Sequence, residues 1–426
     1  MKRYEDLTAE ELSAEKSKVE REFEGLKAKN LSLNMARGKP GKEQLDLVSD
    51  ILTVLQKPED CLCEDFDTRN YGQFSGLPAA KRLFAEILGC KPEQCFIGGN
   101  ASLQLMYDVI AKAWTHGLLH SVRPWGKEAR IKFLCPSPGY DRHFRVTESF
   151  GAELITVPML PTGPDMDLVE ELVKDPQVRG MWCVPKYSNP DGIIYSGETV
   201  RRIANLKPAA PDFTVMWDNA YCIHEFEGDF VPFDDMIGLC AEAGNPDMVF
   251  EFASTSKVTF PGAGICVMAS SVENIGYIEN LMKAQIISFD KVNQLRHVRY
   301  LQDKAHTLEL MKRHAEVLRP KFHCVLDTLE REIGPLGLAE WQKPKGGYFL
   351  SVNVKPGLAK RTLELCKELG VVMTPAGATY PYGIDPRDSN IRIAPSLPPV
   401  SELEKAMEVF CVCLKKAALE QLTVES

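Results

Sequence analysis

The chain has 426 residues, of which 44% are hydrophobic and 26% charged. This composition is globular, and the length is sufficient for one large and one smaller domain. The 50 basic and 59 acidic residues give a formal net charge of −9 without any basic run, which argues against nucleic acid as a partner. No apolar stretch is long enough to cross a membrane.

The thirteen cysteines are scattered along the chain without a Cys-x-x-Cys pair. The close pairs Cys61 and Cys63, and Cys411 and Cys413, do not have the spacing of a zinc site. We therefore expect free thiols, no metal site and a reducing compartment, the cytoplasm.

The N-terminal region predicts a helix followed by extended chain. Thr8 to Glu11 has the pattern of a capping box and opens a charged helix. Residues 31–40 then run into a glycine and proline turn that contains Arg37 and Gly38. Taken alone, Arg37 would be an ordinary surface charge.

Two segments further on combine glycines with side chains of interest. Residues 69–78 are broken by glycines and carry Tyr71, which alone would be a core or surface aromatic. Residues 96–115 predict a short strand, two glycines and a helix. The free amides of Ala101 and Ser102 at the start of that helix favour an anion such as phosphate. Asn100 fits this site, and it also fits an ordinary N-cap.

Short apolar runs then alternate with helical or turn-rich segments, which predicts an α/β domain on a mostly parallel sheet. Ligands on such sheets gather at the carboxyl ends of the strands. Tyr140, Asn189, Asp218 and Lys257 each follow an apolar run. The topology can therefore bring these four distant residues into one cleft.

Lys257 lies in the segment Ser254-Thr-Ser256-Lys257, just before a proline and glycine turn. A lysine in such a string is usually solvated. Here, however, Asn189-Pro and Asp218-x-x-Tyr221 precede it in the chain. The order Asn-Pro, Asp-x-x-Tyr, Ser-x-Ser-Lys resembles the fold-type I pyridoxal phosphate (PLP) enzymes, specifically a divergent, aspartate-aminotransferase-like subgroup of the class I aminotransferases. Matching motifs run from Gly38 to Arg392.

The resemblance implies a large α/β domain, residues 46–305, with a mostly parallel seven-stranded sheet. It also implies a smaller α+β domain formed by both termini, residues 1–45 and 306–426. Residues 287–318 read as one long helix that leads into this second domain.

The resemblance also implies roles around PLP. Lys257 would hold the cofactor as an imine (Schiff base) and shuttle the Cα proton, and Asp218 would keep the pyridine nitrogen protonated so that the ring accepts electrons. Tyr221 and Asn189 would donate to the phenolate oxygen, and Tyr140 would stack on the ring. The implied phosphate ligands are Asn100, Ala101, Ser102, Ser254, Ser256 and, from the partner of a homodimer, Tyr71.

By the same resemblance, the planar fork of Arg392 would bind the substrate α-carboxylate, with Gly38, Arg37 and Asn189 close by. A dicarboxylic substrate needs a second cation, for which the candidates are Arg37, Lys283, Lys291 and Arg296. We expect an aminotransferase that moves the amino group of an L-amino acid, L-aspartate first, to 2-oxoglutarate in a ping-pong reaction.

One departure from the family pattern concerns the phosphate. Many class I aminotransferases carry an arginine shortly after the lysine, whereas residues 258–265 contain none, so other groups must meet the phosphate charge. Two alternatives also stay open: a PLP-dependent lyase or decarboxylase on the same fold, and a non-enzymatic PLP-binding sensor domain. The sensor is disfavoured because about 35 residues before the first site segment are too few for a DNA-binding domain.

Overall fold

The computed structural model describes residues 2–425. The α-helices are α1 (Ala9–Lys27), α2 (Lys42–Leu47), α3 (Pro78–Leu88), α4 (Ser102–Thr115), α5 (Asp141–Ser149), α6 (Met166–Leu172), α7 (Gly197–Ala204), α8 (Met236–Glu242), α9 (Val272–Met282), α10 (Lys291–Leu301), α11 (Lys304–Glu332), α12 (Ala359–Glu368) and α13 (Val400–Glu425). The strands are β1 (Leu33–Asn34), β2 (Leu62–Cys63), β3 (Phe66–Asp67), β4 (Cys95–Gly98), β5 (Lys132–Ser137), β6 (Glu153–Leu160), β7 (Gly163–Pro164), β8 (Val178–Cys183), β9 (Thr214–Asp218), β10 (Val249–Ser254), β11 (Cys266–Ala269), β12 (Ala339–Trp341), β13 (Leu350–Val354), β14 (Val371–Val372) and β15 (Asn390–Ile393).

The centre of the molecule is a sheet with the strand order β4-β11-β10-β9-β8-β5-β6-β7. The neighbours from β10 through β9, β8 and β5 to β6 all pair in parallel. Only β11, which is antiparallel to β10 and β4, and the two-residue β7 run against the others. This confirms the mostly parallel sheet, and β7 adds a short edge strand to the seven that were expected.

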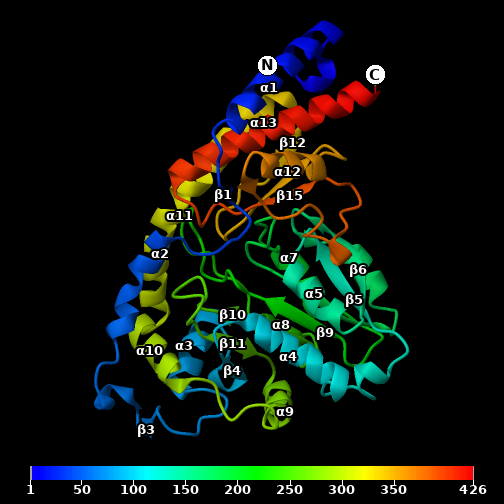
Figure 1. Cartoon of the computed structure of the whole chain (residues 1–426). Coiled ribbons are helices and arrows are strands. Elements are labelled where there is room, and N and C mark those ends of the chain that lie inside the picture. Colours follow the sequence, from blue (N-terminus) through cyan, green and yellow to red (C-terminus); the bar gives the residue numbers. More distant parts are fainter. Residues whose placement is uncertain (1, 426) are drawn as a thin grey trace.

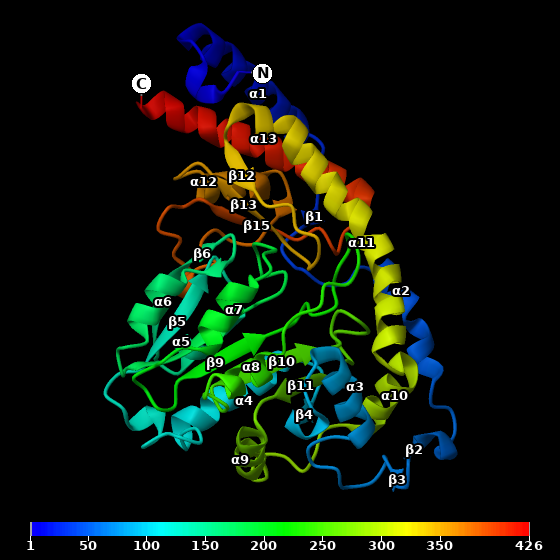
Figure 2. The same ribbon diagram turned by 180° about the vertical axis from the view of Figure 1, so that it is seen from behind.

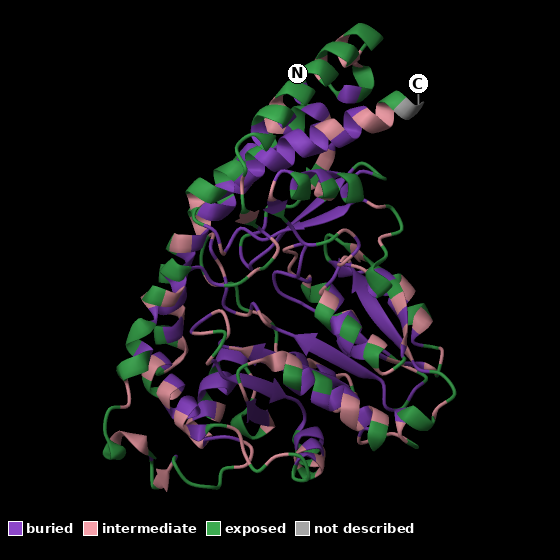
Figure 3. Cartoon of the chain, viewed as in Figure 1, coloured by how far each residue is buried: buried purple, intermediate pink, exposed green. Residues whose placement is uncertain are grey.

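Side chains that alternate along these strands fill a core on each face of the sheet. In β9, Trp217 packs into the cluster on one face and Met216 into the cluster on the other. The central strands are therefore buried on both sides (Figure 3). Helices cover both faces, which explains why these strands read as continuous apolar runs in the sequence.

A third core cluster joins the two ends of the chain. It combines Phe23 of α1, Leu329 of α11, Val352 of β13 and Phe410 of α13. In Figures 1 and 2 the helices α1 and α13 lie beside one end of α11, over the small sheet β12-β13-β15. This cluster supports the predicted smaller domain formed by both termini, although its boundaries stay a prediction. Residues 1 and 426 lie outside the described residues.

The single helix expected over residues 287–318 is wrong. The structure has two helices there, α10 and α11, because Gln302 has a positive φ of 61° and ends α10. The carboxylate of Asp303 then accepts a hydrogen bond from the backbone N–H of His306, 2.8 Å away, and starts α11. At the N-terminus the predicted capping box is present, with Thr8 and Glu11 bonded to each other's backbone N–H.

Candidate active site

Residues that follow the carboxyl ends of β5, β8, β9 and β10 lie in contact with one another. Nζ of Lys257 lies 4.9 Å from the ring centroid of Tyr221, three residues after the end of β9. The ring of Tyr140 lies 4.9 Å from that of His143, which contacts Asp218. Asn189 and Tyr140 line one small cavity, and the charge of Asp218 acts on Lys257. The four residues expected to converge therefore lie near one another at one edge of the sheet.

Lys257 occupies a turn directly after β10. Its ammonium also lies 5.8 Å from the ring centroid of Tyr348. Burial lowers the pKa of Lys257, and the negative charge of Asp218 opposes that shift. The side chain is therefore biased toward the neutral amine, the form that acts as a nucleophile.

Behind Lys257, a buried polar chain from other elements fixes the turn. Gln44 Nε2 donates to the hydroxyl of Tyr348 at 2.8 Å. The Gln44 amide also lies 3.2 Å from Nδ1 of His314, whose Nε2 lies 3.1 Å from the carbonyl oxygen of Val258. These hydrogen-bonded residues could not be recognised from the sequence, because they are far apart in it and each reads as an ordinary core polar residue.

Asp218 is buried and bonded on one side only. Its Oδ2 lies 2.8 Å from Nε2 of His143. The imidazole stacks on Trp182, with centroids 4.4 Å apart and planes 8° apart. The other oxygen, Oδ1, is buried without a hydrogen-bond partner among the described residues. A buried carboxylate oxygen in that state is an acceptor prepared for a donor from a ligand.

The predicted anion site, called the anion cup below, is formed by the residues at the start of α4 and by the turn before Lys257. Ser256 Oγ donates to the carbonyl of Asn100 at 3.0 Å, and Ser254 Oγ donates to Ser256 Oγ at the same distance. Asn100 is not the N-cap: that residue is Ala101, which makes no side-chain cap, while the Asn100 amide donates to the carbonyl of Pro261 at 3.1 Å. The first amides of α4 are therefore left for an anion.

Arg392 is buried, at 7% exposure, and held on three sides. Nη1 donates to Oδ1 of Asp141 at 3.0 Å and to Oδ1 of Asn189 at 3.2 Å. Nε donates to Oγ1 of Thr374 at 3.4 Å, and the guanidinium carbon lies 4.9 Å from the ring centroid of Phe349. Nη2 has no such partner within residues 2–425.

Gly38 packs against the same aromatic residue. A Cβ at Gly38 would lie 2.3 Å from the ring of Phe349, so no larger residue fits without displacing that ring. Phe349 in turn lies against Arg392. Gly38 is thereby tied to the Arg392 site, while the side chain of Arg37 is exposed.

The other candidates are not brought to Arg392 by any contact recorded for residues 2–425. Tyr71 is 80% exposed, and Lys283 is exposed. Lys291 is buried and donates to Ser288 Oγ at 2.6 Å. Arg296 donates through Nη2 to Asn293, and its Nε is buried without a partner in the described chain.

The chain is similar to known proteins over nearly its whole length. The sequence model of the family described as aspartate amino-transferase matches residues 7–425. The aspartate aminotransferase of Corynebacterium glutamicum is 44% identical over 416 residues, which cover 98% of this chain and 96% of the relative.

This chain belongs to the aspartate aminotransferase family. A crystal structure of an aspartate transaminase from Corynebacterium glutamicum aligns with a TM-score of 0.95 at 44% identity, over 98% of both chains. A crystal structure of α-aminoadipate aminotransferase from Thermus thermophilus shares the fold, with a TM-score of 0.74 at 21% identity over 92% of this chain and 93% of the other.

Membership in the aspartate aminotransferase family makes the protein an aminotransferase and confirms the fold class. Amino-group transfer is thereby favoured over the lyase, decarboxylase and sensor alternatives. The sequence reasoning missed His143, Asp141, Thr374 and Phe349 as parts of the site. A signal existed for two of them, since His143 and Asp141 directly follow Tyr140 in the first turn of α5.

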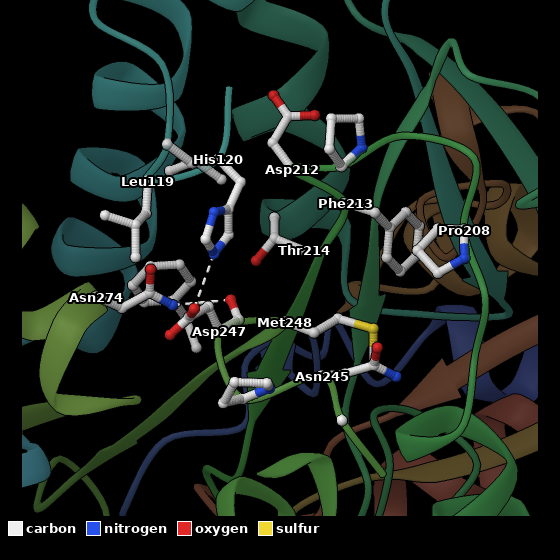
Figure 4. A pocket seen from close by; sticks show the side chains of 15 residues that line it. Leu119, His120, Pro208, Asp212, Phe213, Thr214, Asn245, Asp247, Met248 and Asn274 are labelled. Carbon is white, nitrogen blue, oxygen red and sulfur yellow. Dashed lines mark hydrogen bonds and ion pairs between the residues drawn. The ribbon is translucent and has the colours of Figure 1, made fainter. Parts of the chain in front are cut away.

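A cavity of about 170 Å³ lies elsewhere in this aminotransferase, near the amino-terminal ends of β9 and β10 (Figure 4). Two of its polar side chains already have partners: His120 lies 2.8 Å from Asp247, and Asn245 donates to the backbone carbonyls of Ala204 and Leu206. It contains none of the predicted site residues. Among the described residues there is no cluster of side chains suited to a metal ion and no helix with the length and apolarity of a membrane span.

Proposed function

We propose that this aminotransferase binds PLP and transfers the amino group of L-aspartate to 2-oxoglutarate in two half-reactions. The observation that carries the proposal is the buried, unpartnered Oδ1 of Asp218, an acceptor suited to the N–H of a pyridinium ring. When bound, PLP supplies an aldehyde that condenses with amines and a ring that withdraws electrons from the substrate Cα.

The surrounding residues fit that cofactor. Tyr140 would cover the ring face, and Asn189 and Tyr221 would donate to the ring oxygen. Burial raises the pKa of the Tyr140 hydroxyl to about 12 and that of Tyr221 well above its ordinary value. Both hydroxyls therefore stay protonated at neutral pH, as hydrogen-bond donors must.

The phosphate would occupy the anion cup described above. The proposed ligands are the amides and side chains of Asn100, Ala101 and Ser102, together with the hydroxyls of Ser254 and Ser256 and, from a partner subunit, Tyr71. Hydroxyls and helix amides would thus replace the arginine that this chain lacks after Lys257.

Lys257 would act twice. As a neutral amine it would form the covalent bond to the cofactor, and once the substrate amine has displaced it, the free Nζ would take the proton from Cα and return it. Its lowered pKa supports both tasks, because a permanently charged ammonium could neither attack nor accept a proton.

Arg392 would bind the α-carboxylate, since its Nη2 lacks a partner in the described chain and its charge lies beside Asn189. Gly38 would line the place where the α-carboxylate binds, and Arg37 would lie at the edge of that place. For the side-chain carboxylate, the candidates remain Arg37, Lys283, Lys291 and Arg296, with at least one supplied by the partner.

We propose that the protein forms a homodimer with shared active sites. We also propose that it is located in the cytoplasm. The exposed Tyr71, together with the exposed apolar side chains of Leu52, Leu62 and Ile287, supports burial against a second copy. The thirteen free cysteines support a reducing compartment.

The test is a half-reaction with purified protein. L-aspartate added without an oxo acid should yield about one equivalent of oxaloacetate per active site and then stop, and 2-oxoglutarate should restart turnover. Continuous turnover without an acceptor would instead indicate a lyase or decarboxylase.

A further inference from the structure

The first turn of α5 makes a contact with Arg392 that the proposed function has not used. Asp141 is the first residue of the helix, and its carboxylate accepts a hydrogen bond from Nη1 of Arg392 at 3.0 Å. The arginine side chain is 8% exposed and the aspartate side chain 31%. The pair therefore lies at the inner edge of the site, where the ion pair is only partly screened by water.

Nη1 carries two hydrogens, and both are committed. One is directed to Asp141, and the other to the side-chain oxygen of Asn189 at 3.2 Å. The other edge of the Arg392 guanidinium is formed by Nη2 and Nε. Its one hydrogen bond among the described residues is the long 3.4 Å bond from Nε to Thr374. A carboxylate can pair bidentately with that edge while Nη1 keeps its two partners.

We propose that Asp141 is a positioning residue for Arg392: together with Asn189 it fixes Nη1, so that the Nη2 and Nε edge faces the α-carboxylate of the substrate. An arginine side chain has many rotamers, and immobilising it in advance lowers the entropy lost when substrate binds. This inference rests on the proposed function, because it assigns a substrate carboxylate to Arg392.

The same turn gives the arrangement a structural reason. Asp141 and His143 are two residues apart in this turn, and they contact two different parts of the site, Arg392 and Asp218. The helix α5 thus holds Arg392 in register with Asp218, although the two residues belong to different sheets.

The test compares Asp141→Ala with Asp141→Asn. The alanine variant should raise KM for both aspartate and 2-oxoglutarate about tenfold or more, the size expected for losing a hydrogen bond to a charged group, with a smaller change in kcat. The asparagine variant keeps an acceptor oxygen at the same place and should return KM to within about threefold of the wild type. The dissociation constant of α-methyl-aspartate, which has no Cα proton to lose, should follow the same order.

Two controls separate positioning from general stability. Asp167→Ala removes an ion-paired aspartate from the first turn of another helix, α6, and should leave KM unchanged. In an Arg392→Ala background, removing Asp141 should change substrate affinity by less than about twofold, because the two residues act through one contact.

An unchanged or lower KM in Asp141→Ala would overturn the inference; a lower value would mean that Asp141 competes with the substrate for Arg392. A rise in KM that asparagine does not rescue would also contradict it, because the hydrogen bond would then not be the cause. Wild-type protein that is inactive with aspartate would instead count against the proposed function.

Discussion

Nε2 of His143 lies 2.8 Å from one oxygen of Asp218 and leaves the other oxygen buried and unpaired within the described chain. The imidazole is itself clamped flat against Trp182. The aspartate is thereby oriented with its free oxygen available to a ligand, before any ligand arrives. Such preorganisation is the means by which an enzyme avoids reorienting polar groups during the reaction.

Replacing Asp218 by asparagine should leave the protein folded and able to bind PLP but lower kcat by several orders of magnitude. The ring nitrogen would lose the negative charge that keeps it protonated, and with it the capacity to accept electrons. The rate of the aspartate half-reaction measures this directly. A loss smaller than about tenfold, equivalent to about 1.4 kcal/mol, would mean that another group performs the role.

His143→Phe should retain the stacking on Trp182 but lose the bond to Asp218. We expect kcat to fall about 10-fold to 100-fold, because a hydrogen bond to a charged group is lost without removing the charge itself. His120, which pairs with Asp247 near the far end of the sheet, provides the matched control. His120→Phe should leave kcat unchanged, and an equal loss in both variants would refute a specific role for His143.

Substrate choice depends on a second cation. Alanine variants of Arg37, Lys283, Lys291 and Arg296 should include one that lowers kcat/KM for aspartate far more than for alanine, since only aspartate leaves an unpaired carboxylate. The quantity to compare is the aspartate to alanine ratio of kcat/KM in each variant. If no variant changes that ratio, the acidic-substrate proposal should be dropped, although the aminotransferase assignment stands.

A pH effect on stability should arise at Glu251, which is buried and accepts a hydrogen bond from Asn219 at 2.8 Å. Burial raises the pKa of Glu251 to about 8. The folded state therefore binds a proton that the unfolded state releases between the ordinary pKa and about 8, and stability falls as pH rises through that window. Glu251→Gln should remove this loss of stability. The Tm of the variant minus the Tm of the wild type should therefore be larger at pH 9 than at pH 6, by about 2 °C or more. A Tm difference that is the same at both pH values would show that Glu251 does not titrate there.

The sequence was most informative where chemistry requires a residue type at the end of a strand. Asn189, Asp218 and Lys257 could be placed because each follows an apolar run, and parallel strands end at one edge. The break at Gln302 could not be foreseen, since it depends on one residue with a positive φ inside a pattern that is helical on both sides. The supporting partners were also hidden, because Gln44 and Tyr348 meet over 304 positions of sequence and neither belongs to a local motif.

The most direct test of the account is to treat the PLP-loaded protein with borohydride and map the labelled peptide by mass spectrometry. The account predicts one phosphopyridoxyl group per chain, attached to Lys257, together with loss of activity, and no label in Lys257→Ala. A label on a different lysine, or an unreduced cofactor that is removed by dialysis from an active wild type, would contradict the assignment of Lys257 as the residue that holds PLP.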